Sequence, residues 1–208
     1  MRKRQKKIRL AVLIGRGGRL SAICRCCKKI ENLDLILVVS HKRESLGIDW
    51  AQKRKIESFY FRLSDWKKQG GDREGYDLEL ARILKKRKIN LIIMAGWDLI
   101  VSVGFLNQFP NKVMNIHPSL LPSFPGIDSE KQALDYGVKY TGCTLHFVDS
   151  GTDTGAIILQ RIIEITENET VESLQKKMHK KEEEIICKGI KLFSQGRLRI
   201  KGRKVSIL

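Results

Sequence analysis

The residues best suited to proton transfer lie at the end of one short apolar segment, 112–116. They are the amide of Asn115 and the imidazole of His117, two positions apart. Side chains at positions i and i+2 of a strand point to the same side, so we expect Asn115 and His117 to share one face. Asn can donate a hydrogen bond to an oxygen that gains negative charge, and His exchanges a proton near neutral pH. The alternative interpretation is a strand end that carries a structural histidine.

A turn rich in Asp and Gly, 149–155, holds the second set of candidates. Asp149 and Asp153 flank Ser-Gly-Thr, and a carboxylate at this place can orient His117 or hold a water. The alternative is an Asx-turn, in which the carboxylate binds its own backbone. His146, on the preceding apolar segment, is expected on one face with Thr144, where it is either packed or catalytic.

The third candidate is the glycine-rich run Gly15-Arg16-Gly17-Gly18-Arg19, which lies between the first predicted strand and the first predicted helix. Glycine amides and a helix N-terminus bind phosphate well, and Arg16 or Arg19 can add a charge-assisted hydrogen bond. The spacing matches neither G-x-G-x-x-G nor the P-loop. A tight strand-to-helix turn also needs glycine, so a plain turn remains the alternative.

Alternating strands and helices must position these residues. Near-continuous apolar or β-prone segments predict strands at 8–14, 33–39, 58–61, 91–95 and 112–116, and amphipathic segments predict helices at 20–30, 44–54 and 73–87. This alternation indicates an α/β fold with a mostly parallel, twisted, Rossmann-like sheet and helices on both faces. Ligands bind such sheets outside the carboxyl ends of the strands.

The second half of the chain has a different pattern. A loop with several prolines follows His117, then a helix near 129–136 and strands at 144–148 and 156–165. A short turn joins these two strands, which predicts an antiparallel hairpin. A long charged helix is expected over 169–192, and the tail 196–208 indicates two short β segments around Lys201 and Gly202.

Composition excludes several classes of protein. The chain has 208 residues, of which 42% are hydrophobic and 30% charged, as in a folded domain. No apolar run reaches the roughly 18 residues of a membrane span, and no signal peptide is evident, so we expect a cytoplasmic protein. The five cysteines are an odd number, which argues against a secreted disulfide framework, and they lack paired C-x-x-C spacing, so no metal site is predicted.

The formal net charge of +17 requires an explanation. A basic surface attracts polyanions in general and would steer phosphorylated and carboxylated ligands. No recognition helix, aromatic-interleaved patch or zinc finger accompanies the basic residues, so the pattern does not predict specific nucleic-acid binding. Solvated helix faces account for most of them.

Three segments together resemble one known family, the folate-dependent formyltransferases. Residues 115–122, Asn-Ile-His-Pro-Ser-Leu-Leu-Pro, followed by Phe-Pro-Gly at 124–126, resemble its signature loop. Residues 142–149 and 153–160 are similar to the same family in order and spacing. The resemblance covers nearly the whole chain and is closest to the phosphoribosylglycinamide formyltransferase branch, because of the proline after His117 and the glycine-rich first loop.

The resemblance implies a role for each matching position. The family's catalytic positions fall on Asn115, His117 and Asp153. Its positions for binding the acceptor substrate, phosphate loop included, fall on Gly15, Arg16, Gly17, Gly18, Arg19, Arg73, Pro118 and Glu182. Its folate-pocket positions fall on Gly96, Trp97, Leu99, Ile100, Val101, Val148, Asp149 and Gly151.

The resemblance also implies a reaction: transfer of a formyl group from 10-formyltetrahydrofolate to the amine of glycinamide ribonucleotide, without a metal. It implies the formyltransferase fold as one domain over 1–208, with an acceptor-phosphate half at 1–110 and a catalytic, folate-binding half at 111–208. We expect small-molecule partners only and a monomer or homodimer. The alternatives are a related formyltransferase or formyltetrahydrofolate hydrolase with another acceptor, and a basic nucleic-acid-binding protein on this scaffold.

The chain departs from the family pattern at a few places. Gly18 and Arg19 stand where Ser and Asn are usual, which keeps an anion site plausible but alters its hydrogen bonds. In the segment 97–99 the family commonly has Phe-Met-Arg, so Asp98 and Leu99 remove an arginine from the wall of the folate pocket.

Overall fold

The computed structural model describes residues 7–208, which form two compact units. The first unit ends at Met114 and the second extends from Asn115 to Leu208. This division lies inside strand β5 (Val113–His117). The halves expected from the family resemblance meet just before that strand, at residues 110 and 111.

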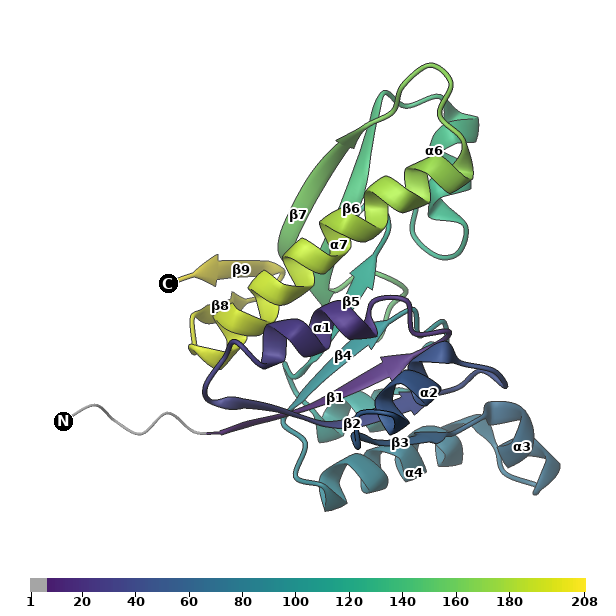
Figure 1. The fold of residues 1–208 in the computed structure, drawn as a ribbon, viewed down its shortest axis with the longest axis vertical. Helices are drawn as coiled ribbons and strands as arrows, with labels where there is room; N and C mark the ends of the chain where they lie inside the picture. The colour runs from purple at the N-terminus through teal and green to yellow at the C-terminus, as the bar shows by residue number, and fades with distance from the viewer. Residues whose placement is uncertain (1–6) are drawn as a thin grey trace. The chain divides into compact units, whose positions relative to one another are not determined.

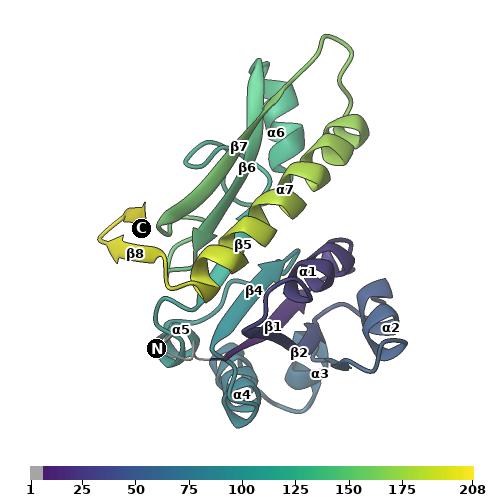
Figure 2. The same cartoon turned by 60° about the vertical axis from the view of Figure 1, so that its left-hand side comes forward.

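The first unit is built on four parallel strands in the order β3-β2-β1-β4. They are β1 (Ile8–Ile14), β2 (Leu33–Ser40), β3 (Glu57–Tyr60) and β4 (Leu91–Ala95). The helices are α1 (Leu20–Cys27), α2 (Leu46–Gln52), α3 (Leu63–Lys68), α4 (Arg73–Lys86) and α5 (Val103–Gln108). Helices α1 and α4 lie on opposite faces of these strands (Figure 1, Figure 2), which confirms the predicted layering.

The core of the first unit follows directly from the apolar runs. Residues 10–14 of β1 are completely buried, because helices cover both faces of the strand and leave no side for polar residues. All four strands lie where the sequence predicts them, within one or two residues. Helices α3 and α5 were not predicted, since each has only six residues and shows less than two turns of periodicity. Ser102 caps α5 by accepting a hydrogen bond from the Phe105 amide.

The second unit arranges its strands in the order β5-β6-β7-β9-β8. Its elements after β5 are α6 (Ser129–Tyr136), β6 (Tyr140–Phe147), β7 (Ile157–Glu164), α7 (Val171–Ser194), β8 (Leu198–Lys201) and β9 (Lys204–Ile207). Strands β6 and β7 pair antiparallel, which confirms the predicted hairpin. The two β segments expected in the tail, β8 and β9, also pair antiparallel. Helix α7 packs along β6 and β7 (Figure 1).

Strand β6 begins at Tyr140, earlier than the predicted start at residue 144. The prediction stopped short of Gly142, a residue that usually weakens strands. Here glycine is required, because a Cβ at this position would lie 1.9 Å from the Arg161 carbonyl oxygen of β7. The glycine therefore marks a close approach of two backbones and does not end the strand.

Helix α7 is the longest helix, with 24 residues, but charged side chains occur along its length. Within the described part of the chain, no helix combines the length and apolar character needed to cross a bilayer.

Candidate active site

Three of the predicted catalytic side chains come together in the second unit. Asn115 and His117 are both on β5, and Asp153 lies in the turn between β6 and β7. The Asp153 Oδ2 atom is 3.2 Å from His117 Nδ1, and its Oδ1 atom is 3.4 Å from Asn115 Nδ2. The carboxylate therefore contacts both the imidazole and the amide, and the three groups form one cluster.

The His117 ring is 4% exposed, and both of its nitrogens have partners. Its Nε2 atom is 2.9 Å from the carbonyl oxygen of Phe124, and its Nδ1 atom faces Asp153. A carbonyl oxygen only accepts, so Nε2 must donate a proton in that contact. A carboxylate also accepts, so the surroundings suit a ring that donates from both nitrogens, as an imidazolium does.

Asp153 is held in an unusual backbone conformation with φ of 54°, which Asp tolerates better than most residues. The Gly126 amide donates a hydrogen bond of 2.9 Å to its Oδ2 atom. Burial alone would raise the pKa of Asp153, but contact with His146, the Gly126 amide and the charge of His117 outweigh burial and lower the pKa. The carboxylate is thus ionised beside the imidazole at neutral pH.

His146 belongs to the same cluster, although the sequence left it open between packing and catalysis. Its Nε2 atom is 3.4 Å from Asn115 Nδ2 and 3.6 Å from Asp153 Oδ1. Its Nδ1 atom donates to the carbonyl oxygen of Phe147, and its Nε2 atom faces both Asn115 and Asp153. An irregularity in the register of β6 lies between Leu145 and His146, and such bulges re-aim side chains. Strand alternation alone does not reveal a bulge.

The loop after β5 is fixed by side chains from the β6–β7 hairpin. Thr144 Oγ1 donates to the Ser119 carbonyl at 2.7 Å and accepts from the Leu121 amide at 3.1 Å. Gln160 Nε2 donates to both the Leu121 carbonyl and Thr144 Oγ1 at 3.0 Å. The carbonyl of Pro118, a predicted substrate-binding residue, accepts from Ser129 Oγ at 3.2 Å. The loop that presents Phe124 and Gly126 to the cluster is therefore ordered by buried polar contacts.

The two aspartates of the β6–β7 turn have separate structural roles. Asp149 Oδ1 accepts from the Gly151 amide at 3.2 Å and from Thr154 Oγ1 at 2.6 Å, as in an Asx-turn. Only Asp153 faces His117. Val148 is half-buried and Gly151 is partly exposed, so the predicted folate-pocket positions in this turn are accessible.

In the first unit, the glycine loop follows β1 and ends at Arg19, the N-cap of α1. A Cβ on Gly15 would lie 2.6 Å from the Gly96 carbonyl oxygen, and Gly17 has φ of 89° and abuts Gly47. Backbone packing thus requires glycine at both positions, whatever the loop binds. Gly18 differs, because no atom lies within 4 Å of the place where its Cβ would be.

The predicted folate-wall segment 96–101 follows β4. Trp97 and Val101 are buried, whereas Ile100 is 62% exposed and Leu99 is half-buried. Arg73 donates to the Ile100 carbonyl and also pairs with the buried carboxylate of Asp77 at 3.2 Å. These contacts attach Arg73 to the wall segment, while its assignment to the acceptor stays a prediction.

His41 is a residue that sequence analysis missed. It lies beside the glycine loop, 3.6 Å from the Cβ position of Gly15, and makes an edge contact with Trp97. Its Nε2 atom is 2.9 Å from Asp98 Oδ1, although the geometry of this contact is not that of a hydrogen bond. Burial lowers the pKa of His41, and the nearby Asp98 opposes that shift only in part.

Glu182, the remaining predicted substrate-binding residue, is completely buried in α7. Its assignment to the acceptor stays a prediction. Among residues 7–208, no group of three or more His, Cys, Asp or Glu side chains is arranged to hold a metal ion.

Comparison with known proteins places these features in context. Residues 8–190 match the family model described as formyl transferase. Phosphoribosylglycinamide formyltransferase of Bacillus subtilis is 37% identical over 170 residues, which are 81% of this chain and 85% of that protein. The crystal structure of glycinamide ribonucleotide transformylase 1 from Symbiobacterium toebii has a TM-score of 0.92 and 38% identity, covering 97% of this chain and 94% of that one.

Some relatives are much longer. The trifunctional purine biosynthetic protein adenosine-3 of Drosophila melanogaster is 40% identical over 182 residues. Those residues are 86% of this chain but only 13% of the Drosophila protein.

Proposed function

Because this chain belongs to the formyl transferase family, we propose that it transfers a formyl group from 10-formyltetrahydrofolate to the amine of glycinamide ribonucleotide, a step of purine biosynthesis. The observation that carries this proposal is the contact of the Asp153 carboxylate with the His117 ring beside the Asn115 amide. These are the groups that an acyl transfer between two nitrogens needs: oxyanion donors and a proton carrier.

The proposed reaction is direct acyl transfer. The acceptor amine attacks the formyl carbon, a new C–N bond forms, and the carbonyl oxygen gains negative charge. Asn115 Nδ2 donates to that oxygen, and His117 Nε2–H does so once it is released from the Phe124 carbonyl. The C–N bond to the folate then breaks, while the proton lost by the amine passes to the leaving folate nitrogen with the help of Asp153.

The remaining proposed roles concern binding. The glycine loop 15–19 binds the acceptor's phosphate through its amides, with Arg16 and Arg19 as charged partners. The segment 96–101 and the turn 148–151 bind the folate donor. Arg73, Pro118 and Glu182 contribute to the acceptor site.

A transfer assay tests the proposal. The purified chain is mixed with 10-formyltetrahydrofolate, with or without glycinamide ribonucleotide, and tetrahydrofolate release is followed by absorbance. We expect release only with the acceptor; equal release without it would identify a hydrolase. His117→Ala should remove donors worth about 2.7–4 kcal/mol of barrier, and near-normal turnover in this variant would rule out the mechanism.

The acceptor site is tested separately with Arg19→Ala. This variant should raise KM for glycinamide ribonucleotide far more than KM for the folate. Equal effects on both substrates would contradict the assignment of the glycine loop to phosphate.

A further inference from the structure

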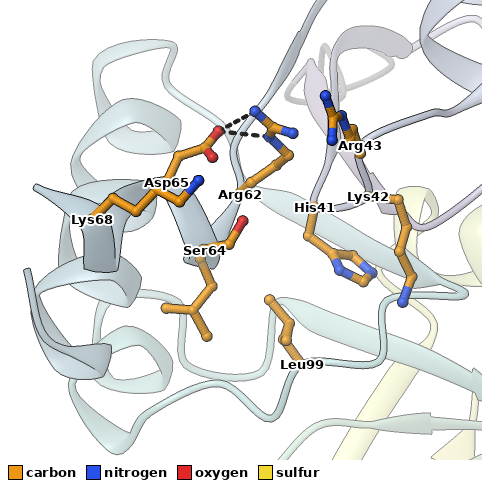
Figure 3. A pocket seen from close by; sticks show the side chains of 9 residues that line it. His41, Lys42, Arg43, Arg62, Ser64, Asp65, Lys68 and Leu99 are labelled. Carbon is orange, nitrogen blue, oxygen red and sulfur yellow. Dashed lines mark hydrogen bonds and ion pairs between the residues drawn. The ribbon is translucent and has the colours of Figure 1, made fainter.

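The basic side chains around the cavity of the first unit have carboxylates among them. This cavity, of about 430 Å³, is lined by residues that include Arg43, Arg62, Asp65, Lys68 and Leu99 (Figure 3). Arg62 Nε lies 2.6 Å from Asp65 Oδ2, and Lys42 pairs with Asp98. Leu99 also belongs to the segment 96–101, so the cavity adjoins the proposed folate site and is not a separate one.

The end of the second unit is different, because it carries positive charge alone. Residues 185–208 contain no Asp or Glu, and the last carboxylate before them, that of Glu184, is held by Arg161 at 2.7 Å. The basic residues of this stretch are Lys188, Lys191, Arg197, Arg199, Lys201, Arg203 and Lys204. The last four of them lie in the hairpin of β8 and β9, residues 198–207, which we call the basic ribbon.

The register of the basic ribbon sorts its side chains onto two faces. One face carries Leu198, Ile200, Val205 and Ile207. The other face carries Arg199, Lys201, Lys204 and Ser206, and all four are exposed. Arg203 is exposed in the turn. The ribbon lies at the margin of the second unit in both views (Figure 1, Figure 2), so its charged face is open to solvent.

The cations of the ribbon have no acidic partner. Arg199, Lys201, Arg203 and Lys204 form no ion pair with any carboxylate of residues 7–208. Lys201 and Lys204 are also directly opposite each other, and like charges in this arrangement destabilise a hairpin. Folding gains nothing from this repulsion. An anionic ligand on the same face would remove it.

Protection of a sheet edge accounts for only part of this pattern. Strand β8 is the edge strand, and charged side chains on an edge prevent pairing with other molecules. That role suits Arg199 and Lys201. It does not require Lys204, because β9 is paired on both sides, or Arg203 in the turn. It also does not require one sign of charge, since a glutamate blunts an edge as well as a lysine.

The composition of the ribbon distinguishes between classes of anionic partner. Docking on a membrane needs apolar side chains beside the cations, and neither the charged face nor the turn carries any. Single-stranded nucleic acid is bound by stacking its bases on aromatic rings, and residues 194–208 contain no aromatic residue. A duplex keeps its bases stacked inside and displays its phosphates, which suits a surface that offers only charge and a hydroxyl.

The shape of the charged face favours RNA among duplexes. One face of a two-stranded ribbon is broad and shallow, and its other face is half-buried at Leu198, Ile200 and Val205. The minor groove of an A-form RNA duplex is wide and shallow and presents 2′-hydroxyls between its phosphates, whereas the grooves of B-form DNA are deep. Ser206 adds a hydroxyl that can bond a 2′-hydroxyl.

We propose that the basic ribbon binds the backbone of double-stranded RNA without regard to base sequence. Arg199, Lys201, Arg203 and Lys204 pair with phosphates, and Ser206 contacts the sugar. None of these residues belongs to the cluster around Asp153 or to the proposed substrate sites. The inference is therefore independent of the proposed formyl transfer.

The test is a titration of a fluorescein-labelled RNA duplex with the full chain, followed by anisotropy at several salt concentrations. Four cations that each neutralise one phosphate give a slope of log K against log salt of about −3.6, so affinity should fall roughly 100-fold between 0.05 and 0.2 M salt. A second duplex of different sequence should bind equally. The variant Arg199→Gln, Lys201→Gln, Arg203→Gln, Lys204→Gln should lose most of the affinity and most of this slope.

A matched control removes the same charge elsewhere. Lys28→Gln, Lys53→Gln, Lys67→Gln, Lys86→Gln changes four exposed positions of the first unit and should keep the slope. Equal weakening in both variants would assign binding to net charge and would overturn the proposal. Urea unfolding should show the ribbon variant to be at least as stable as the wild type, because the repulsion between residues 201 and 204 is gone. Lys204→Gln alone should reduce the slope by about 0.9, and an unchanged slope would count against the ribbon.

Further ligands test the choice of RNA. A DNA duplex of the same sequence, single-stranded RNA and phosphatidylserine vesicles should all bind more weakly than the RNA duplex. Equal or tighter binding of any of them through the same four cations would overturn the assignment. RNA binding should persist in His117→Ala, and the ribbon variant should keep its kcat for formyl transfer. Loss of RNA binding in His117→Ala would contradict a separate surface.

Discussion

At the residue scale, Asp153 connects the cluster in the second unit. Its two carboxylate oxygens contact different partners, with Oδ2 facing His117 and the Gly126 amide, and Oδ1 facing Asn115 and His146. A single carboxylate thereby orients the imidazole and contacts the amide beside it. Three polar side chains and a backbone amide converge on it, which is why a buried acid remains ionised.

Replacing this carboxylate by an amide tests its role. Asp153→Asn keeps the size of the side chain and tolerates the positive φ, so the fold should persist, while kcat falls by about 10²–10⁴-fold as proton transfer is lost. Asp135→Asn is the control, because Asp135 is an exposed aspartate of α6 that pairs with Lys131 and lies outside the proposed catalytic and binding residues. Equal loss in both variants, measured as kcat with folding checked by circular dichroism, would contradict a special role for Asp153.

His41 leads to a prediction about stability and pH. Its pKa is lowered in the folded chain, so the unfolded chain binds a proton more readily than the folded one. The free energy of unfolding therefore has the full contribution of neutral His41 above about pH 6.5, the ordinary pKa of histidine. This contribution is lost as the pH falls below that value. Urea unfolding at several pH values should show a smaller loss of stability between pH 7 and 5 for His41→Gln than for the wild type. An identical pH profile in both proteins would disprove this.

At the element scale, the ordering of the loop after β5 depends on one hydroxyl of β6. Thr144 Oγ1 takes part in three hydrogen bonds, with Ser119, Leu121 and Gln160. A loop with three prolines needs such external partners, because its own backbone forms no regular ladder. The catalytic residues therefore depend on the hairpin for position as well as for chemistry.

Thr144→Val tests this dependence. The substitution keeps the shape but leaves buried polar atoms of the loop without a partner, so we expect a loss of about 1–3 kcal/mol in the free energy of unfolding, together with a lower kcat. Thr141→Val is the control on the same strand, because Thr141 is buried and its Oγ1 has no hydrogen-bond partner among the described residues. It should be neutral or stabilising in urea unfolding, and a loss as large as that of Thr144→Val would argue against the loop explanation.

At the scale of the whole molecule, the charge of +17 acts on ligands that are themselves anionic. A basic protein raises the encounter rate of phosphate- and carboxylate-bearing substrates, and salt screens this effect. We therefore expect kcat/KM for both substrates to fall as the salt concentration rises from about 0.01 to 0.2 M, the range over which the Debye length drops from about 30 to below 10 Å. The value of kcat should change little, since bound substrates no longer need steering. Steady-state kinetics at several salt concentrations would show this, and a fall in kcat alone would contradict steering.

Much of the fold could be predicted from local pattern. The apolar runs of β1, β2 and β4 are continuous because helices cover both faces, so their sequence reports their burial directly. Helix α6 lies at the predicted residues. Short helices such as α3 escaped prediction, because fewer than two turns provide too little periodicity to distinguish a helix from a loop.

The sequence by itself determined which chemical groups are present, which strands carry them, and which family the chain resembles. The residue pattern alone did not distinguish Asp149 from Asp153; the family resemblance assigned catalysis to Asp153, and the tertiary structure shows that Asp153 faces His117 while Asp149 binds its own turn. The tertiary structure also brought His146 to the cluster through a bulge, and it gathered Arg43, Lys68 and Leu99 around one cavity from three separate segments. The physical reason is that local propensity depends on neighbours in the chain, whereas the direction of a side chain depends on the packing of segments distant in sequence.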